Sequence, residues 1–164
     1  MSLIFKKYIF SFEDTNSEMA LTYQTLQVEL KQKFENSVQR FVKLCREHFG
    51  DSLLAILVFG SYVKNVFRKG SDIDFIVIHE ASKETVKSFE KSLPNYARFK
   101  PHPTFGHMQK MKFDEENDIP WHIFYMTPLA FYFFIEKSNL TFKVVYRKKG
   151  EEERLNMLLN PKEF

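Results

Sequence analysis

Two aspartates one residue apart, Asp72 and Asp74, are the residues of this sequence whose type and spacing best suit chemistry. Successive side chains of a strand point to opposite faces, so the two carboxylates project side by side while Ile73 points the other way. Carboxylates this close repel each other unless a divalent cation or a proton cancels the repulsion. Because the pair offers only hard oxygen ligands, it suits Mg²⁺ or Mn²⁺ better than Zn²⁺.

Small and basic residues that suit a phosphate precede this pair. Gly60 allows a close turn, and Ser61 supplies a hydroxyl and a backbone amide that can hold a phosphate oxygen. The polar stretch that follows carries basic side chains that could bind phosphate groups, although the stretch could equally be a solvated turn. The candidate phosphate-binding residues are Gly60, Ser61, Lys64, Arg68, Lys69 and Ser71.

The two motifs together resemble those of a known family. Residues 59–61 (Phe-Gly-Ser) and 71–74 (Ser-Asp-Ile-Asp), each joined to an apolar run, look like the signature of the DNA polymerase beta superfamily of nucleotidyltransferases, above all its minimal members. The resemblance covers roughly residues 50–137. It implies an α/β (α+β) nucleotidyltransferase fold with a small mixed β-sheet flanked by helices. It also implies transfer of a nucleoside monophosphate, which we expect to be AMP from ATP, to an acceptor hydroxyl that the sequence does not specify.

The resemblance also implies a role for individual residues. Asp72 and Asp74 would hold Mg²⁺ or Mn²⁺, and Gly60 and Ser61 would bind the β- and γ-phosphates. The third carboxylate of the family aligns with His122, which is a departure from the family pattern. An imidazole can accept a proton at pH 7 and can bind a divalent ion, but it brings no negative charge and favours softer metals than magnesium.

Two other interpretations of this third position remain open. Asp118 lies four residues before His122, or about 13 Å in an extended strand. It could replace the histidine only if the chain kinks at Pro120. His122 could also be a half-buried strand histidine without a role in chemistry.

Two other classes of function compete with an active transferase. A catalytically impaired module could bind nucleotide and metal and act as a regulatory or toxin–antitoxin type interaction subunit. The 19 phenylalanines would suit such an interface with a helical protein partner or a second copy of the chain. A single-strand nucleic-acid binder could use the aromatic and basic residues of 94–112, although no stacking motif is readable there.

Length and composition limit these choices. We expect the 164 residues to form one nucleotidyltransferase-like domain with a core at about 50–137, preceded by an arm and helix (1–49) and followed by a strand and tail (138–164). The 24 basic and 21 acidic residues nearly balance, so the charge does not demand a nucleic-acid partner. The single cysteine, Cys45, excludes an internal disulfide and a cysteine metal cage. Without a membrane-spanning run or a leader pattern, the protein is expected to be cytoplasmic.

The N-terminal third is expected to be a short arm followed by a long helix. Apolar clusters at residues 3–5 and 8–10 have no assignable form. The spacing of Thr15 and Glu18 predicts a capping box and a helix that begins near Asn16. An apolar residue then recurs every three or four positions as far as Phe49, so we expect one helix, or two in line, to pack this stripe on the sheet. Cations on the other face, such as Lys31 and Arg40, are expected to be solvated.

The remaining elements follow from apolar runs, caps and turn residues. Residues 94–118 are long for a connection and are interpreted as a functional loop or an irregular hairpin. The expected strands are residues 53–59, 72–78, 121–126 and 142–147, the last at an edge. The expected helices are a brief one over 62–67, one from Ser82 to about Leu93, one over 129–137 after the Thr127-Pro128 cap, and a short one in the tail.

Overall fold

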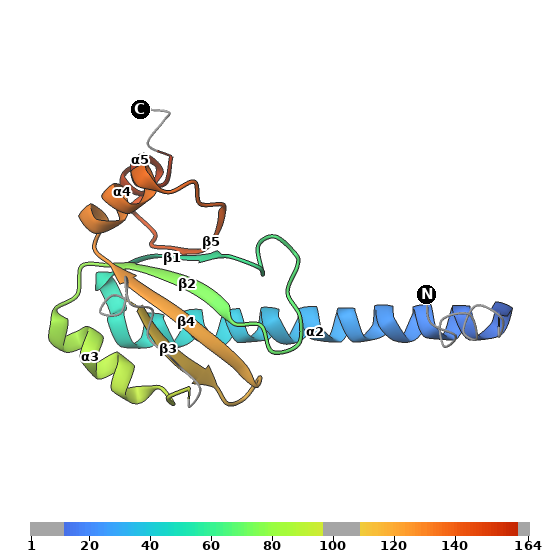
Figure 1. Ribbon diagram of the computed structural model, residues 1–164. Coiled ribbons are helices and arrows are strands. Elements are labelled where there is room, and N and C mark those ends of the chain that lie inside the picture. The colour runs from blue at the N-terminus through green and yellow to red at the C-terminus, as the bar shows by residue number, and fades with distance from the viewer. Residues whose placement is uncertain (1–11, 97–108, 161–164) are drawn as a thin grey trace. The chain divides into compact units, whose positions relative to one another are not determined.

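A computed structural model describes residues 12–96 and 109–160 of the chain (Figure 1). The chain divides into two compact units, residues 1–33 and 34–164, and each is described by itself below. The expected apolar clusters at 3–5 and 8–10 lie outside the described residues.

The described elements are helices and strands in the order α2-η1-β1-β2-α3-β3-β4-α4-β5-α5. The helices are α2 (Phe12–Phe49), the 3₁₀ turn η1 (Gly50–Ser52), α3 (Lys83–Ser92), α4 (Pro128–Lys137) and α5 (Glu152–Leu159). The strands are β1 (Leu53–Phe59), β2 (Ile73–His79), β3 (Gln109–Asp114), β4 (Ile119–Met126) and β5 (Phe142–Arg147).

The five strands form one mixed sheet in the order β3-β4-β2-β1-β5. Strands β2 and β4 run parallel, and the other three neighbouring pairs are antiparallel. The wholly apolar strand β1 lies inside the sheet with helices on both faces, which explains why six of its seven residues are buried. A small mixed sheet flanked by helices confirms the predicted fold class.

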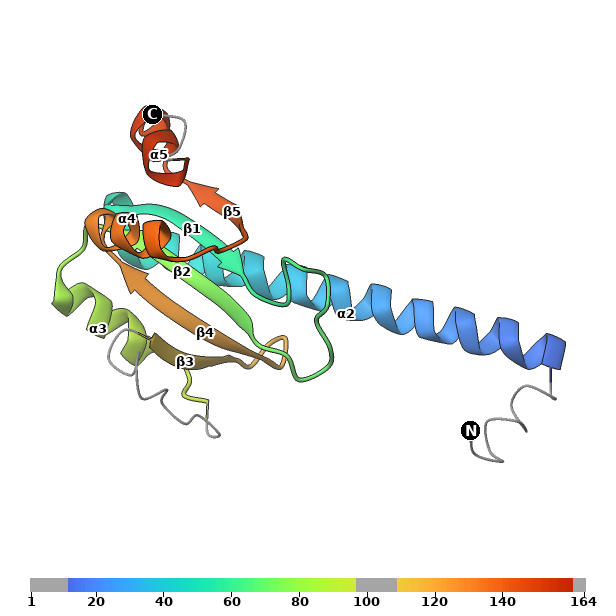
Figure 2. The ribbon, with the colours of Figure 1, turned by 45° about the horizontal axis from the view of Figure 1, so that its top comes forward.

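Each face of the sheet packs against a different set of helices. On one face, Phe41 of α2 stacks on Phe75 of β2 at 3.9 Å between ring centroids, and it meets Trp121 of β4 edge-on at 5.1 Å. On the other face, Phe131 of α4 and Leu155 of α5 are fully buried in a cluster with residues of β1, β2 and β4. Figure 1 shows α4 and α5 close together and apart from α3, and Figure 2 shows α4 beside β1 and α5 next to the end of β5.

Most of the expected elements are confirmed with small shifts of their ends. Strands 53–59 and 142–147 have the predicted bounds, and β5 lies at an edge of the sheet. The predicted caps are also present. The hydroxyl of Ser82 accepts a hydrogen bond from the Thr85 amide at 3.2 Å, and that of Thr127 accepts one from the Ala130 amide at 3.3 Å.

Two predicted helices differ from the structure. Helix α2 begins at Phe12 instead of near Asn16, so Thr15 lies inside the helix. The brief helix predicted over 62–67 is wrong, because residues 61–65 form turns and Asn65 has a left-handed backbone with φ of 57°. A left-handed residue interrupts a right-handed helix, so the segment stays a loop.

The expected apolar stripe of α2 changes character along the helix. Within residues 34–164, Phe34, Phe41 and Cys45 are fully or almost fully buried, as predicted. Within residues 1–33, the side chains of Tyr23 and Leu26 are 65% and 57% exposed. The expectation that this first part of the stripe packs on the sheet stays a prediction.

The segment expected as a loop or irregular hairpin contains a regular strand, β3, which pairs antiparallel with β4. Its last residue, Asp114, is fully buried and accepts hydrogen bonds from Ser37 at 2.6 Å and from Arg40 at 2.8 Å. Arg40 is therefore an ion-pair partner of a buried carboxylate, and its prediction as a solvated cation is wrong. Ser37 also accepts a hydrogen bond from the Trp121 indole at 2.8 Å, which ties the β3–β4 hairpin to α2.

No helix in the described part of the chain is both long and apolar enough to cross a membrane. The single-domain division and the cytoplasmic location stay predictions.

Candidate active site

Asp74 and His122 lie side by side on the two parallel strands. They are direct partners in the pairing of β2 with β4, so their side chains project from the same face of the sheet. Nδ1 of His122 is 2.9 Å from Oδ1 of Asp74. The side chain of His122 is 20% exposed and that of Asp74 is 17% exposed. A ligand can therefore reach both groups, although most of the surrounding water is displaced.

Asp72 completes a group of three possible metal ligands. It lies just before β2, which begins at Ile73 and not, as expected, at Asp72. One ligand atom from each of Asp72, Asp74 and His122 lies within 4.8 Å of the other two. The predicted side-by-side projection of the two carboxylates is confirmed, and the histidine joins them.

The site packs tightly against Gly60, which follows β1. Gly60 has φ of 76°, a left-handed conformation that an L-residue with a side chain rarely adopts. A Cβ at this position would overlap Oδ2 of Asp74 and lie 3.2 Å from its Cγ. A glycine is therefore required here by the carboxylate itself, in addition to any approach of a phosphate.

Apolar side chains flank the polar pair along the same row of the sheet. Phe59 of β1 pairs with Asp74, and Met111 of β3 pairs with His122. The ring of Phe124, two residues after His122, lies 4.5 Å from the imidazole and 5.5 Å from the Phe59 ring. Phe59 was predicted only as part of the motif at residues 59–61, and Met111 and Phe124 were not predicted to flank the site. The spacing of two residues places Phe124 on the same face as His122, and the strand register places Phe59 and Met111 beside the pair.

The surroundings of Asp72 disfavour its ionised form. Burial, followed by the charge of Asp74, raises the pKa of Asp72, and His122 and a backbone amide oppose this rise. The charged form of Asp72 is therefore less favourable in the folded protein than in water. The donor set of two carboxylates and one imidazole fits a divalent ion such as Mn²⁺ or Mg²⁺.

The candidate phosphate-binding residues lie on the loop between β1 and β2. Ser61 is half-buried directly after Gly60, and its carbonyl accepts a hydrogen bond from the Val66 amide at 3.0 Å. Ser71 and Arg68 form a tight turn. The Arg68 amide donates to the Ser71 hydroxyl at 2.9 Å, and the Ser71 amide donates to the Arg68 carbonyl at 2.9 Å. The structure brings Gly60 against the carboxylates, whereas it uses the Ser71 hydroxyl inside the loop.

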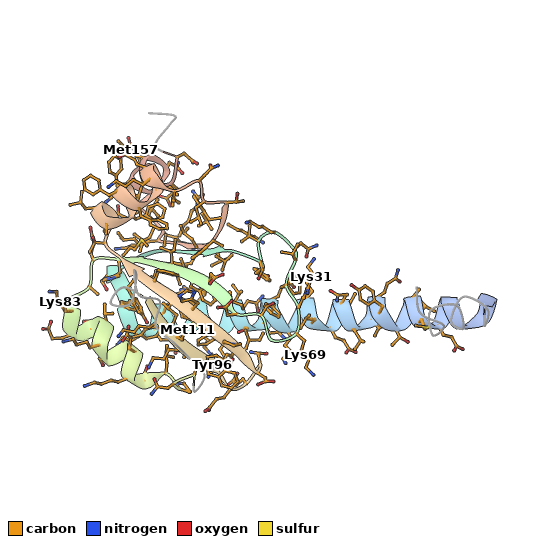
Figure 3. The ribbon with its side chains drawn as sticks, viewed as in Figure 1. Lys31, Lys69, Lys83, Tyr96, Met111 and Met157 are labelled. Atoms are coloured by element: carbon orange, nitrogen blue, oxygen red, sulfur yellow. The ribbon has the colours of Figure 1, made fainter. Side chains whose placement is uncertain are left out.

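The three cations of this loop, Lys64, Arg68 and Lys69, are exposed (Lys69 is labelled in Figure 3). Within the part of the chain that the structure describes, none of their side chains forms an ion pair. Their charges are therefore available to a ligand, but no contact links them to the carboxylates.

Aromatic packing holds the loop in place. The ring of Tyr62 stacks on Phe34 of α2 at 5.9 Å and also contacts Phe67 at 5.7 Å, and Phe34 and Phe67 are 4.7 Å apart. This trio fixes both ends of the segment that follows Gly60. The loop is therefore ordered by side chains, although it contains no helix.

Asp118 is not part of the candidate site. It lies in the turn between β3 and β4 with φ of 55°, and β4 continues through Pro120. The kink that would bring Asp118 to the carboxylates is absent, since Pro120 and Trp121 both belong to the paired strand. Of the residues that the structure describes, His122 occupies the third position.

Comparison with known proteins identifies the family. The family model described as "Nucleotidyltransferase domain" matches residues 38–149, which include all five strands and the candidate site. The chain belongs to this nucleotidyltransferase family. The resemblance predicted from residues 59–61 and 71–74 is thereby confirmed, and the chain is assigned to the transferases.

Two individual proteins resemble this nucleotidyltransferase. A putative protein adenylyltransferase of Methanocaldococcus jannaschii is 40% identical over 43 residues, which are 26% of this chain and 29% of that protein. The match therefore spans less than a third of the relative's length. The structure of the STING-associated CdnE c-di-GMP synthase from Capnocytophaga granulosa has a TM-score of 0.45 and 18% sequence identity, over 76% of this chain and 43% of that one.

Proposed function

We propose that this nucleotidyltransferase transfers AMP from ATP to an acceptor hydroxyl in the presence of Mg²⁺ or Mn²⁺. The observation that carries the proposal is the convergence of Asp72, Asp74 and His122 within 4.8 Å, against a glycine turn. The name of the archaeal relative supports the adenylyl group and makes a protein hydroxyl the first acceptor to test.

In this proposal Asp72 and Asp74 hold the divalent ion. The bound ion would supply positive charge to the triphosphate and to the departing pyrophosphate. Burial and the charge of Asp74 raise the pKa of Asp72, so its charged form costs free energy in the fold, and a bound divalent ion would offset that cost.

Gly60 and Ser61 are proposed to bind the β- and γ-phosphates through the backbone amide and the hydroxyl of Ser61. Lys64, Arg68 and Lys69 are proposed to approach the same phosphates, since they have no ion-pair partner among the described residues. Their exposure means that each contributes modestly, so the charge of the loop matters more than any one cation.

His122 is proposed to take the acceptor's proton. The Asp74 carboxylate is an acceptor, so Nδ1 of the neutral ring donates to it, and Nε2 is the nitrogen that can accept a proton. The acceptor oxygen attacks the α-phosphorus, the bond from that phosphorus to the bridging oxygen breaks, and pyrophosphate leaves with the electron pair. Asp74 then stabilises the imidazolium that forms, as carboxylates do beside catalytic histidines.

A label-transfer experiment tests this function. The protein is incubated with Mn²⁺ or Mg²⁺ and ATP labelled in the α-phosphate, alone and with candidate acceptor proteins, and γ-labelled ATP serves as the parallel control. We expect α-label, and no γ-label, on an acceptor. Asp74→Asn should abolish the transfer, whereas Asp51→Asn, a substitution in the exposed turn before β1, should retain it.

Two outcomes contradict the proposal. Transfer of the γ-label would show a different reaction. A rise of the melting temperature with Mn²⁺ and ATP, but no label on any acceptor and no release of pyrophosphate, would show a module that binds nucleotide without chemistry.

A further inference from the structure

A cavity of about 420 Å³ lies between α3 and the carboxyl ends of the parallel strands β2 and β4. It is lined by His79, the last residue of β2, by Tyr125 near the end of β4, and by side chains of α3. Asp74 lies five residues before His79, or about 17 Å along the strand. The cavity is therefore separate from the candidate active site. It also lies where ligands commonly bind in open α/β sheets, outside the carboxyl ends of parallel strands.

The hydroxyl of Tyr125 is buried and has no hydrogen-bond partner among the described residues. Its ring is held by Phe49, His79 and Phe89, each with a centroid separation of 6.4 Å. Burial, followed by the charge of Glu90, raises the pKa of Tyr125 far above its usual range, so the hydroxyl keeps its proton. A buried donor without a partner is costly, and an acceptor atom of a ligand would remove that cost once the side chains that cover the hydroxyl move aside.

Cations surround the mouth of this cavity. Lys83 and Lys87 lie four residues apart on α3, where two like charges repel each other, and neither has an ion-pair partner in the described part of the chain (Lys83 is labelled in Figure 3). Lys110 of β3 also lines the cavity, with Nζ 4.0 Å from a carboxylate oxygen of Glu90. Three lysines and one carboxyl group, that of Glu90, therefore line the cavity. Burial raises the pKa of Glu90, which disfavours its negative charge.

The wall of the cavity is apolar between these charges. Val86 of α3 and the ring of Tyr125 both line it. A ligand that uses the whole cavity needs an anionic group for the lysines, a hydrogen-bond acceptor for the phenol, and an apolar body.

We propose that this cavity binds a small organic anion, whose phosphate or carboxylate group lies near Lys83 and Lys87, whose acceptor oxygen meets the Tyr125 hydroxyl, and whose apolar part packs on Val86. This site is distinct from the nucleotide site and does not depend on the proposed AMP transfer.

Amide chemical shifts of the ¹⁵N-labelled full chain test the proposal. Phenyl phosphate and benzoate are titrated in the presence of EDTA, so that no metal-bound nucleotide site can form. Benzyl alcohol provides an uncharged ring and inorganic phosphate an anion without a ring. We expect saturable shifts for residues 79–90 and 125–127 with at least one of the two aromatic anions, and much weaker ones with both controls. The stronger of the two anions distinguishes a phosphate ligand from a carboxylate ligand.

Matched variants locate the ligand. Tyr125→Phe removes one hydroxyl and should weaken binding roughly 2- to 10-fold, the usual worth of one hydrogen bond. The double variant Lys83→Gln/Lys87→Gln should remove detectable binding. Lys91→Gln, on the same helix but outside the cavity lining, should leave the affinity unchanged.

The proposal is wrong if neither aromatic anion shifts these amides at millimolar concentration. It is also wrong if the shifts centre on residues 60–74, or if Tyr125→Phe and the double lysine variant bind as the unmodified protein does.

Discussion

Gly60 and Asp74 lie in such close contact that no side chain fits between them. Phe59, the last residue of β1, pairs with Asp74, so the turn at Gly60 begins directly beside the carboxylate. A Cβ at position 60 would overlap Oδ2 of Asp74. The turn that is proposed to hold phosphate and the carboxylate that is proposed to hold metal are therefore fixed relative to each other by direct contact.

Gly60→Ala should disrupt both fold and site. The left-handed backbone and the overlap with Asp74 predict a loss of roughly 1–3 kcal/mol in unfolding free energy, together with a loss of most transferase activity. Urea denaturation and label transfer measure the two effects. Gly70→Ala is the matched control: its φ is 89°, but no atom lies within 4 Å of the added Cβ. It should cost about 1–2 kcal/mol and leave activity intact. Equal losses of activity in the two variants would contradict the contact argument.

His122→Asp should change the preference for metal. The substitution places a third carboxylate beside Asp72 and Asp74, and an additional hard oxygen ligand favours Mg²⁺. We therefore expect the ratio of activity with Mg²⁺ to that with Mn²⁺ to rise. His122→Gln removes the proton acceptor and should lower the turnover number by about 10²–10⁴-fold, while ATP binding with Mn²⁺ is retained. Full activity in His122→Gln would exclude the proposed role as base.

Asp72→Asn should stabilise the metal-free protein. The pKa of Asp72 is raised in the folded state, so the folded state binds more protons than the unfolded state between the two pKa values, and stability falls as pH rises through that window. Above that window the unfavourable charge is present. Its removal should therefore raise the unfolding free energy, by less than about 1 kcal/mol because water screens a partly exposed charge, although activity is lost.

Calorimetric melting at pH 4 and pH 7 checks this prediction. The advantage of Asp72→Asn over the unmodified protein should be larger at pH 7 than at pH 4. Mn²⁺ should raise the melting temperature of the unmodified protein more than that of the variant. A variant that is less stable at pH 7 would show that the Asp72 carboxylate stabilises the fold.

Asp114→Asn should destabilise the fold strongly. Asp114 is fully buried and forms an ion pair with Arg40, and it also accepts hydrogen bonds from Ser37 and Asn117. Breaking a buried pair by removing one charge costs about 3–5 kcal/mol. Glu116→Gln is the control, because Glu116 also pairs with Arg40 but its side chain is 70% exposed. Its effect on urea denaturation should stay below about 1 kcal/mol. Similar costs for both would argue against a buried network.

Elements with an apolar period or a cap could be predicted from the sequence, and those stabilised by polar contacts could not. Strand 53–59 is wholly apolar, and the Ser82 and Thr127 caps mark the starts of α3 and α4. Strand β3 was not predicted, because the buried residues on one of its faces are Lys112 and Asp114. A search for apolar alternation cannot recognise a strand that buries charges against Asn95 and Arg40.

The centre of the site was predictable, and its surroundings were not. Asp72, Asp74 and Gly60 are marked by residue type and spacing, and His122 by its position in a strand. Phe59 and Phe124 required the pairing register of β1, β2 and β4, which long-range contacts determine. The false helix over 62–67 arose because Asn65 adopts a left-handed turn that the sequence pattern alone does not reveal.

Paramagnetic broadening by Mn²⁺ would locate the metal ion on the chain. Substoichiometric Mn²⁺ is added to the ¹⁵N-labelled protein, with and without ATP, and the loss of each amide signal is measured. Signals of residues 60–61, 72–74 and 121–123 should disappear first and those of α3 should persist, and Asp74→Asn should remove the effect. Broadening centred on another part of the molecule, or unchanged broadening in Asp74→Asn, would contradict a metal site at Asp72 and Asp74 beside His122.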